Sequence, residues 1–324
     1  MAHLNYYAGI DIGGSNVKYG LVDSTGNIIY RGQKPALVEK GPKPLLHMIT
    51  NIGEDLLLRA AEDDLTINWL GVGSPGPIDN QQGVVRGTSP NIPDWKGTAL
   101  GPHLKEHLNL PVYVDNDANT MALAELRFGA GQRFETILCV TVGTGIGGAI
   151  IINKELWRGS SFSAGELGHM VIQYEGRKCP CGNRGCLEIY CRAGAMIERA
   201  GQKYTANPSE IMRNIIDDDI KQLSIKKIFA AARKNDTLAL ETIEETARIL
   251  GAGLSGAVNL LNPEAVILGG GVIEGGAGFI EIVAEEIRAR AFASATEDLR
   301  IIKAELGNDA GFIGAGLLGE YRTK

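Results

Sequence analysis

The segment YYAGIDIGGSNVKYGLVDSTGNIIYR, residues 6–31, predicts a buried strand at Tyr6–Ile12, a glycine turn and a second strand at Val17–Val22, followed by a polar turn and a third strand. The segment TILCVTVGTGIGGAIIINKELW, residues 136–157, repeats the same pattern around Gly143-Thr144-Gly145. A repeat this long indicates an ancestral duplication rather than a short-repeat solenoid. We therefore expect two α/β halves, with a small-ligand site in the cleft where the two glycine turns meet.

The periodicity of the rest of the chain fits this arrangement. Apolar residues at helical spacing predict helices at Leu45–Ala61, Ala118–Phe128, Thr242–Leu261 and Phe312–Tyr321, between short buried strands. We expect a small α/β domain of residues 1–116 plus 309–324. Residues 117–308 would form a larger α/β domain that carries a cysteine-rich loop.

Composition excludes several classes of protein. The chain has 324 residues, 44% hydrophobic and 22% charged, with a formal net charge of −6. The sequence has no cluster of basic residues, so we expect no nucleic-acid partner. It also has no apolar run long enough to span a membrane. The first residues show no signal-peptide pattern, so we expect a soluble cytoplasmic protein.

Three glycine-rich turns follow buried strands, where backbone N–H groups can approach an anion closely. The turns are Gly13-Gly14, Gly143-Thr144-Gly145 and Gly269-Gly270-Gly271. Ser15 and Thr144 add hydroxyls, and Lys18 follows on a strand. Each turn alone could be an ordinary tight turn, but three at strand ends favour a phosphate site. None has the P-loop spacing, and Gly13-Gly14 lacks the frame of a Rossmann dinucleotide site.

Two aspartates lie where such a site would need charge. Asp11 ends the first strand, where it could face Mg²⁺ beside bound phosphates or simply cap a turn. Asp117 starts a predicted helix, where aspartate is a favoured N-cap. The same position would hold it ionised as a general base for a substrate hydroxyl. These two interpretations of Asp117 are compatible.

A cluster of potential metal ligands lies between Gly165 and Glu188. His169, Cys179, Cys181 and Cys186 form a complete Cys₃His set for tetrahedral zinc, although chance thiols or a disulfide are alternatives. Four protein ligands would leave no open position, so this zinc would be structural. Glu166 and Glu188 flank the cluster.

These motifs together resemble the ROK family of sugar kinases and repressors over nearly the whole chain. The most specific are Gly165-Glu166-Leu167-Gly168-His169 and the spacing Cys179-x-Cys181-x₄-Cys186-Leu187-Glu188. The resemblance implies a duplicated actin-like, ribonuclease-H-like fold with two lobes and a central cleft. It also implies transfer of the γ-phosphate of ATP, with Mg²⁺, to a hexose hydroxyl, usually the 6-hydroxyl.

The resemblance assigns roles to individual residues. Asp117 would be the catalytic base and Asn116 its neighbouring sugar contact, while Asp11, Lys18 and the three glycine turns would hold MgATP. Sugar hydroxyls would be bound by the remaining matched positions, which are Gly76, Asn91, Glu166, His169 and Glu188. His169 would also bind zinc through its other ring nitrogen.

The identity of the sugar stays open at this level. The segment Ser89–Trp95 resembles glucokinases, whereas Val114–Asp117 and the Gly-Ser-Ser-Phe segment before the cysteines are also similar to N-acetylmannosamine kinases. The family's repressors carry an N-terminal DNA-binding segment, for which the early first strand leaves no room, so we expect a glucose kinase rather than a sugar-sensing regulator. The family implies a homodimer. Polyphosphate in place of ATP remains an alternative donor.

Overall fold

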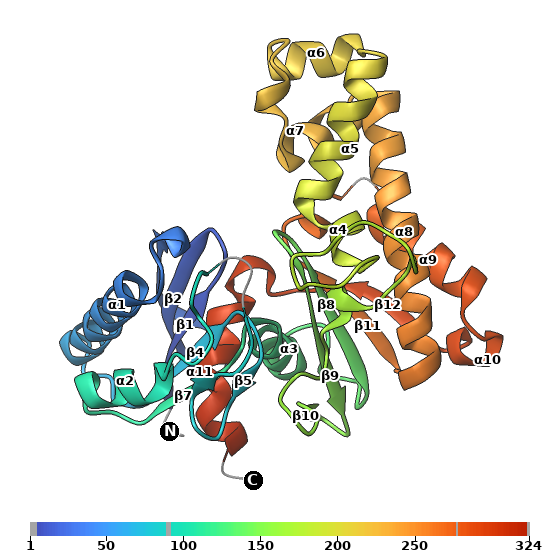
Figure 1. Ribbon diagram of the computed structural model, residues 1–324. Helices are drawn as coiled ribbons and strands as arrows, with labels where there is room; N and C mark the ends of the chain where they lie inside the picture. Colours follow the sequence, from blue (N-terminus) through green and yellow to red (C-terminus); the bar gives the residue numbers. More distant parts are fainter. Residues whose placement is uncertain (1–4, 89–91, 277, 323–324) are drawn as a thin grey trace. The chain divides into compact units, whose positions relative to one another are not determined.

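The computed structural model describes residues 5–88, 92–276 and 278–322 (Figure 1). The chain forms two compact units. Unit 1 contains residues 1–134, 149–165 and 305–324, and unit 2 contains residues 135–148 and 166–304. The chain therefore passes between the units several times, and unit 1 is completed by the last residues.

The first sheet has five strands in the order β3-β2-β1-β4-β7. Their bounds are β1 Tyr6–Ile12, β2 Asn16–Asp23, β3 Ile28–Pro35, β4 Ile67–Ser74 and β7 Val112–Asn116. β1, β2 and β3 pair antiparallel, and β4 pairs parallel with both β1 and β7. The predicted opening of strand, glycine turn, strand, turn and strand is confirmed.

The second sheet has the order β10-β9-β8-β11-β12. Its strands are β8 Ile137–Val142, β9 Ile146–Ile152, β10 Glu155–Trp157, β11 Ala265–Gly269 and β12 Arg300–Lys303. β9 and β10 pair antiparallel, while β11 pairs parallel with β8 and β12. Three strands joined by tight turns, extended by parallel strands, therefore occur in both sheets, as the internal repeat predicts.

Helices cover the first sheet, and the last helix packs most closely. The helices are α1 Pro42–Glu62, α2 Leu100–Leu108, α3 Asp117–Phe128 and α11 Ala310–Arg322, with 3-10 turns η1 Val38–Lys40 and η5 Gly307–Asp309. A Cβ at Gly71 would lie 1.7 Å from the carbonyl oxygen of Ala315, and one at Gly314 would lie 1.6 Å from that of Thr120. Glycine at these positions lets the α11 backbone touch β4 and α3 directly.

The helices of unit 2 follow its cysteine-rich loop. They are α4 Glu188–Cys191, α5 Ala193–Ala206, α6 Glu210–Ile216, α7 Ile225–Ala232, α8 Thr237–Leu261, α9 Phe279–Arg290 and α10 Ala293–Thr296, with 3-10 turns η2 Leu167–His169, η3 Ile220–Gln222 and η4 Ile273–Gly275. In Figure 1, α5, α6, α7 and one end of α8 gather away from the sheet. No helix among the described residues is long and apolar enough to cross a membrane.

Some bounds differ from expectation for local reasons. α8 begins at Thr237, five residues before the predicted start, because Asp236 caps it by accepting from the Ala239 N–H at 2.8 Å. The expected division at residue 116 differs from the compact units, because α3 packs against α11 and so belongs with unit 1. A small hairpin, β5 Ile78–Asp79 with β6 Val84–Val85, has no equivalent among the predicted elements.

Candidate active site

Asp117 is the first residue of α3, directly after β7. Its Oδ1 accepts a hydrogen bond from the Ala118 N–H at 2.9 Å. Burial raises the pKa of Asp117, and the bonds from Ala118 and Asn116 partly oppose that rise. The carboxylate is therefore fixed at a helix start and made more basic than a free aspartate, as a proton acceptor requires.

Asn116 joins this helix start to a neighbouring turn. Its Oδ1 accepts from the N–H groups of Ala118 and Asn119 at 2.9 and 3.2 Å, which makes it the N-cap of α3. Its Nδ2 donates to the carbonyl oxygen of Gly76 at 3.1 Å. Gly76 has φ of +87°, a backbone conformation that favours glycine. Asn116 thus orients both Asp117 and the turn at Gly76.

Asp11 lies within electrostatic reach of Asp117. Burial, followed by repulsion from Asp117, raises the pKa of Asp11 to about 7, and the charge of Lys18 opposes this. A Cβ at Gly311 would lie 2.4 Å from the Asp11 carboxyl group, so the start of α11 packs directly against it. Asp11 and Asp117 are therefore two neighbouring carboxyl groups with raised pKa values, and such a pair of oxygen donors fits a hard divalent cation such as Mg²⁺.

Lys18 lies opposite Asp11 in the pairing of β1 and β2, so their side chains share one face of the sheet. Its Nζ donates to the backbone and side-chain oxygens of Asn308 at 3.0 and 3.3 Å. In the first glycine turn, the Gly13 N–H closes the turn onto the Asn16 carbonyl oxygen at 3.0 Å. Gly14 is half-buried and Ser15 is exposed at the tip.

The other two glycine turns lie side by side in unit 2, at the ends of β8 and β11. The Val272 N–H donates to the Val142 carbonyl oxygen at 3.0 Å, and Gly270, with φ of +96°, would place a Cβ 2.5 Å from that oxygen. Apart from the glycine itself and its two chain neighbours, no described atom lies within 4 Å of a Cβ position at Gly143 or Gly271, so the space beside both glycines is open. Thr144, Gly145 and Gly269 complete these turns.

Glu188 reaches one of these turns. Its Oε2 accepts from the Ile146 N–H at 2.9 Å, and a Cβ at Gly145 would lie 2.6 Å from the same oxygen. Glu188 is also the first residue of α4, two residues after Cys186. One side chain therefore links the glycine turn to the cysteine cluster.

The four predicted zinc ligands come together in unit 2. The ligand atoms of His169, Cys179, Cys181 and Cys186 all lie within 4.8 Å of one another. The Cys181 and Cys186 sulfurs are 3.7 Å apart, too far for a disulfide. That spacing is close to the edge of a tetrahedron with zinc–sulfur bonds of about 2.3 Å.

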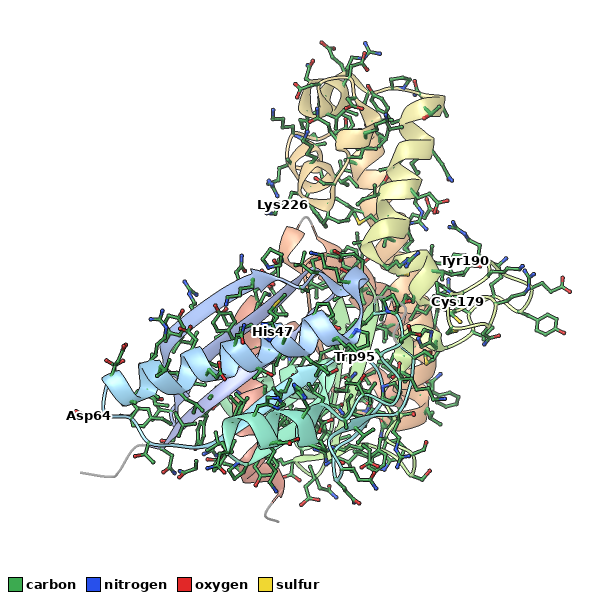
Figure 2. All side chains as sticks on the ribbon, turned by 60° about the vertical axis from the view of Figure 1, so that its left-hand side comes forward. His47, Asp64, Trp95, Cys179, Tyr190 and Lys226 are labelled. Carbon is green, nitrogen blue, oxygen red and sulfur yellow. The ribbon has the colours of Figure 1, made fainter. Side chains whose placement is uncertain are left out.

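Burial raises the pKa of Cys179, and it raises that of Cys186 to about 12. The buried thiols of Cys179 and Cys186 would stay protonated without a compensating cation, and a dication would remove those protons. The exposed Cys181 differs, because hydrogen bonds outweigh its desolvation and lower the pKa of its thiol. The donor set and its spacing therefore fit zinc. Figure 2 shows Cys179 beside Tyr190, whose hydroxyl accepts from the Arg177 N–H at 2.8 Å and supports the loop.

The two ring nitrogens of His169 face different partners. Nδ1 lies 3.7 Å from the Cys179 sulfur, and Nε2 lies 3.9 Å from Oε2 of Glu166. One nitrogen thus faces the ligand cluster and the other faces a carboxylate outside it. Within unit 2, the structure brings together Glu166, His169 and the cysteines.

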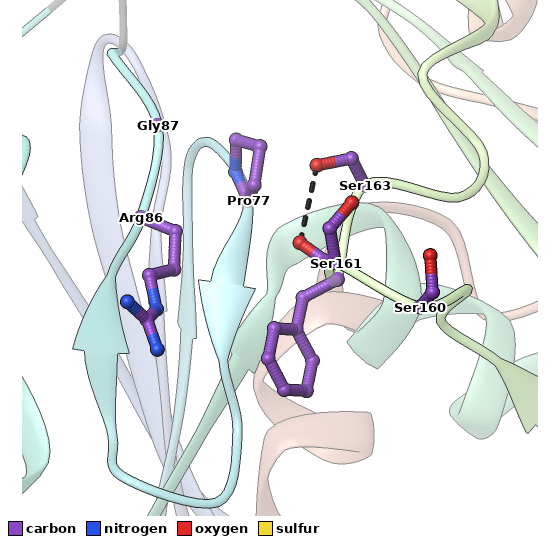
Figure 3. Close-up of a pocket in the computed structure, with 7 residues that line it drawn as sticks. Pro77, Arg86, Gly87, Ser160, Ser161 and Ser163 are labelled. Carbon is purple, nitrogen blue, oxygen red and sulfur yellow. Dashed lines mark hydrogen bonds between the residues drawn. The ribbon is translucent and has the colours of Figure 1, made fainter.

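A cavity of about 430 Å³ lies beside the turn at Gly76 (Figure 3). It is lined by Pro77, Arg86, Gly87, Ser160, Ser161, Phe162 and Ser163. Arg86 donates to the buried Oδ2 of Asp79 through Nε and Nη2 at 3.1 and 2.6 Å, which holds the pKa of Asp79 low. The arginine charge is therefore neutralised, and the cavity offers hydroxyl groups rather than net charge.

Two further side chains hold this region, and sequence reasoning missed both. Trp95, 1% exposed, donates from Nε1 to Ser74 Oγ at 3.1 Å. Arg158 donates from Nε to the buried Oδ2 of Asp115 at 2.7 Å. Neither contact has a signal in residue spacing. The predicted sugar contact Asn91 lies outside the described residues.

A model of the ROK family matches residues 7–321. The chain belongs to the ROK family. The family's duplicated actin-like fold accounts for the two sheets of equal strand order. A glucokinase of Thermotoga maritima is 33% identical over 313 residues, which are 95% of this chain and 95% of that enzyme.

Among solved structures, a ROK family glucokinase of Streptomyces griseus in complex with glucose and AMPPNP is similar, with a TM-score of 0.86 and 32% identity. The match covers 99% of this chain and all of that one (100%). The xylose repressor of Bacillus subtilis is 30% identical over 309 residues, which are 95% of this chain and 75% of the repressor. Kinases and regulators are therefore both among the relatives.

Proposed function

We propose that the protein is an ATP-dependent hexose kinase that phosphorylates the 6-hydroxyl of glucose. The observation that carries the proposal is Asp117, held at the start of α3 with a raised pKa and with Asp11 in electrostatic reach. Similarity to glucokinases over nearly the whole chain supports the choice of sugar.

In this reaction, the 6-oxygen of the sugar forms a bond to the γ-phosphorus of ATP while the bond from that phosphorus to the β,γ-bridging oxygen breaks. ADP leaves, and the hydroxyl proton moves to the carboxylate of Asp117. A base so placed contributes about 10²–10⁴ in rate, and positioning and charge stabilisation supply much of the remainder. Asn116 keeps the carboxylate aimed, because it caps the helix that Asp117 begins.

The phosphates of ATP would be bound by the glycine turns at Gly13-Gly14, Gly143–Gly145 and Gly269–Gly271. Ser15, Thr144 and Lys18 would add a hydroxyl, a hydroxyl and a charge. Mg²⁺ bound at Asp11 would neutralise phosphate charge. The raised pKa of Asp11 supports this role, because a carboxyl group costly to ionise alone gains most from a cation.

The sugar would be read by Glu166, His169 and Glu188, with Asn116, Gly76 and Asn91 as further contacts. Zinc bound by His169, Cys179, Cys181 and Cys186 would be structural, since the protein supplies four ligands. By fixing His169 and the loop that ends at Glu188, it would determine which hydroxyls are recognised. Discrimination among sugars needs such rigidly held polar groups.

Replacement of Asp117 by asparagine tests the proposal. Asparagine keeps an oxygen for the Ala118 N–H, so the helix start stays intact. We expect kcat, measured by coupled ADP release, to fall about 10²–10⁴-fold while glucose affinity stays within about twofold. Asp23→Asn is the matched control, a buried aspartate at the far end of β2 whose loss should spare kcat. Full activity of Asp117→Asn would contradict the assignment of the base.

A second sugar is favoured by one observation. The 430 Å³ cavity beside Gly76 has serine hydroxyls and little net charge, so it offers room for a neutral substituent such as an acetamide. N-acetylmannosamine is therefore the alternative substrate. The ratio of kcat/KM for glucose and N-acetylmannosamine decides between the two sugars.

Similarity to xylose repressors makes a sugar-sensing regulator the alternative from another class. The chain has both Asp117, the proposed base, and Asp11, the proposed Mg²⁺ ligand, in unit 1, which favours a kinase over a regulator without turnover. A regulator would bind a hexose without turnover, so saturable sugar binding without ADP release, over a panel of hexoses and hexosamines, would replace the kinase proposal.

A further inference from the structure

Arg192 lies between α4 and α5, next to the second glycine turn. It follows the last residue of α4 and is the N-cap of α5. The Ala193 N–H donates to the Gly143 carbonyl oxygen at 2.8 Å, so α5 begins directly against the turn Gly143–Gly145. All of these residues belong to unit 2. The surroundings of Arg192 described below are therefore built by one compact unit.

The side chain of Arg192 has no partner for its charge. The residue is half-buried, and its Nε is buried without a hydrogen-bond acceptor among the described residues. In the same part of the chain, no carboxylate forms an ion pair with its guanidinium. Glu188, four residues earlier, accepts instead from the Ile146 N–H at 2.9 Å. Buried polar groups are nearly always hydrogen-bonded, so an unpaired arginine of this kind points to a ligand.

A second arginine of α5 shows the usual arrangement. The Nε of Arg199 donates to Oε1 of Glu245 and its Nη1 donates to Oγ1 of Thr246, both at 2.8 Å. Its Nη2 donates to the Tyr190 carbonyl oxygen at 3.2 Å. All of its guanidinium nitrogens therefore have acceptors, with only 13% of the side chain exposed. The lack of acceptors is thus particular to Arg192 and is not a property of this helix.

The location of the charge makes its isolation more costly. The Nε of Arg192 lies 3.9 Å from the Cβ position at Gly194, the second residue of α5. The charge therefore lies beside the first turn of a 14-residue helix, where the helix dipole is positive and disfavours a cation. That turn has no acidic residue, and no side chain caps it. An anion bound here would pair with the arginine and with the helix N-terminus together.

The glycine turn beside Arg192 has room for such an anion. Apart from Gly143 itself and its chain neighbours, no described atom lies within 4 Å of a Cβ position there. Arginine suits phosphate in particular, because its planar guanidinium stays charged and can donate two parallel hydrogen bonds to phosphate oxygens. Phosphate is also the anion that we propose for the glycine turns.

We propose that Arg192 binds a phosphate group of the phosphoryl donor at the turn Gly143–Gly145. This inference rests on the proposed kinase function, in which that turn holds the phosphates of ATP. It adds a charged group to a turn that otherwise offers backbone N–H groups and the Thr144 hydroxyl. Because the residue would touch the donor and not the sugar, its loss should raise the KM for ATP and leave the KM for glucose within about twofold.

The test uses Arg192→Met in the full-length protein. Methionine removes the charge and the hydrogen-bond donors and keeps much of the side-chain length. In titration calorimetry, we expect the affinity for AMPPNP to fall at least about tenfold, as for the loss of a charge-assisted hydrogen bond. The affinity for adenosine, which carries no phosphate, should change less than about twofold. Tripolyphosphate, titrated in the same way, distinguishes a polyphosphate donor from a nucleotide.

Thermal stability separates this role from a structural one. Loss of an unpaired, half-buried cation should leave the Tm of the ligand-free protein unchanged or raise it. Arg199→Met is the matched control on the same helix. It removes three hydrogen bonds, so its Tm should fall while its affinity for AMPPNP stays within about twofold. Arg192→Lys should retain part of the AMPPNP affinity, because it keeps the charge.

Wild-type affinity for AMPPNP in a folded Arg192→Met variant would overturn the proposal. So would equal losses of affinity for adenosine and AMPPNP, which would locate the contact at the base or ribose. A fall in Tm as large as that of Arg199→Met would assign Arg192 a structural role instead. If the wild-type protein binds tripolyphosphate and not AMPPNP, a tenfold loss with tripolyphosphate supports the proposal with polyphosphate as the donor.

The kinase assignment can fail separately. A wild-type protein that binds AMPPNP but turns over no hexose would defeat that assignment, and the comparison of AMPPNP and adenosine affinities would still decide the role of Arg192. A wild-type protein that binds neither AMPPNP nor tripolyphosphate would overturn both.

Discussion

The ion pair between Arg158 and Asp115 gives the sharpest quantitative prediction. Asp115 lies two residues before Asp117, and its side chain is 1% exposed, while that of Arg158 is 22% exposed. Asp115 also accepts from the Asn119 side chain and the Asn116 N–H, both at 2.8 Å. Replacing Arg158 with methionine would remove the only cation that forms an ion pair with Asp115 among the described residues and would keep most of the side-chain volume.

Breaking a buried pair by removing one partner costs about 3–5 kcal/mol. The two remaining donors and the partial exposure of Arg158 place this case at the lower end, at about 3 kcal/mol. In a unit of this size, 1 kcal/mol shifts Tm by about 2–4 °C, so we expect unit 1 to melt about 6–12 °C lower. The exposed pair of Arg31 with Asp309 is the control, and Arg31→Met should cost less than about 1 kcal/mol.

Intrinsic fluorescence isolates the relevant unit. All 3 tryptophans of the chain, Trp69, Trp95 and Trp157, belong to unit 1. Urea or thermal unfolding followed by tryptophan emission therefore reports unit 1 even if the two units unfold separately. Circular dichroism, which sees both units, gives the comparison.

A double-mutant cycle separates the pair from its parts. Asp115→Asn with Arg158→Met leaves no unpaired charge, so the double variant should be more stable than Arg158→Met alone. A coupling energy below about 0.5 kcal/mol would refute the reasoning, because independent sites add within that margin.

Two further predictions concern the zinc ligands and Asp11. Cys181→Ala should abolish zinc in elemental analysis and raise the KM for glucose about tenfold or more, whereas the control Cys139→Ala, on β8, should keep the zinc. Because Cys181 is exposed, lost packing would not explain the effect. Active protein purified without zinc would contradict this prediction. The pKa of Asp11 is raised to about 7, so below that pH the folded state holds a proton that the unfolded state has released. The stability that this proton contributes is lost as pH rises through about 7. The KM for MgATP should rise as pH falls through the same range, because protonated Asp11 would bind Mg²⁺ poorly. Asp11→Asn should remove that pH dependence of KM; a profile unchanged by the substitution would assign it to another group.

Much of the fold could be predicted from the sequence, because its signals are local. The glycine turns after β1 and β8 and the two-residue turn at Asn153-Lys154 specify the strand connections, and both residues of that turn have positive φ. The clustering of His169 with the three cysteines was predicted for the same reason, since three of the four side chains lie within eight residues. Their spacing alone limits what they can bind.

The contacts that hold the site are different in kind. Asn116 with Gly76, Trp95 with Ser74 and Glu125 with Leu306 join residues far apart in sequence, and each partner alone has an ordinary local explanation. Asn116 reads as a helix cap and Glu125 as one residue of an amphipathic helix. Only the folded chain shows that each one also orients a second segment.

The packing of α11 has a consequence for the order of folding. Gly9, Gly71 and Gly314 let this helix touch β1, β4 and α3 backbone to backbone, so the first sheet lacks one of its covering layers until residues 310–322 exist. Domains generally fold during synthesis in the order in which they are made. β1 ends at Ile12 and α11 begins at Ala310, so every residue of unit 2 has been synthesised by the time that α11 is made. Unit 1 therefore contains both the first strand and the last helix of the chain, and its sheet can be fully covered only at the end of synthesis.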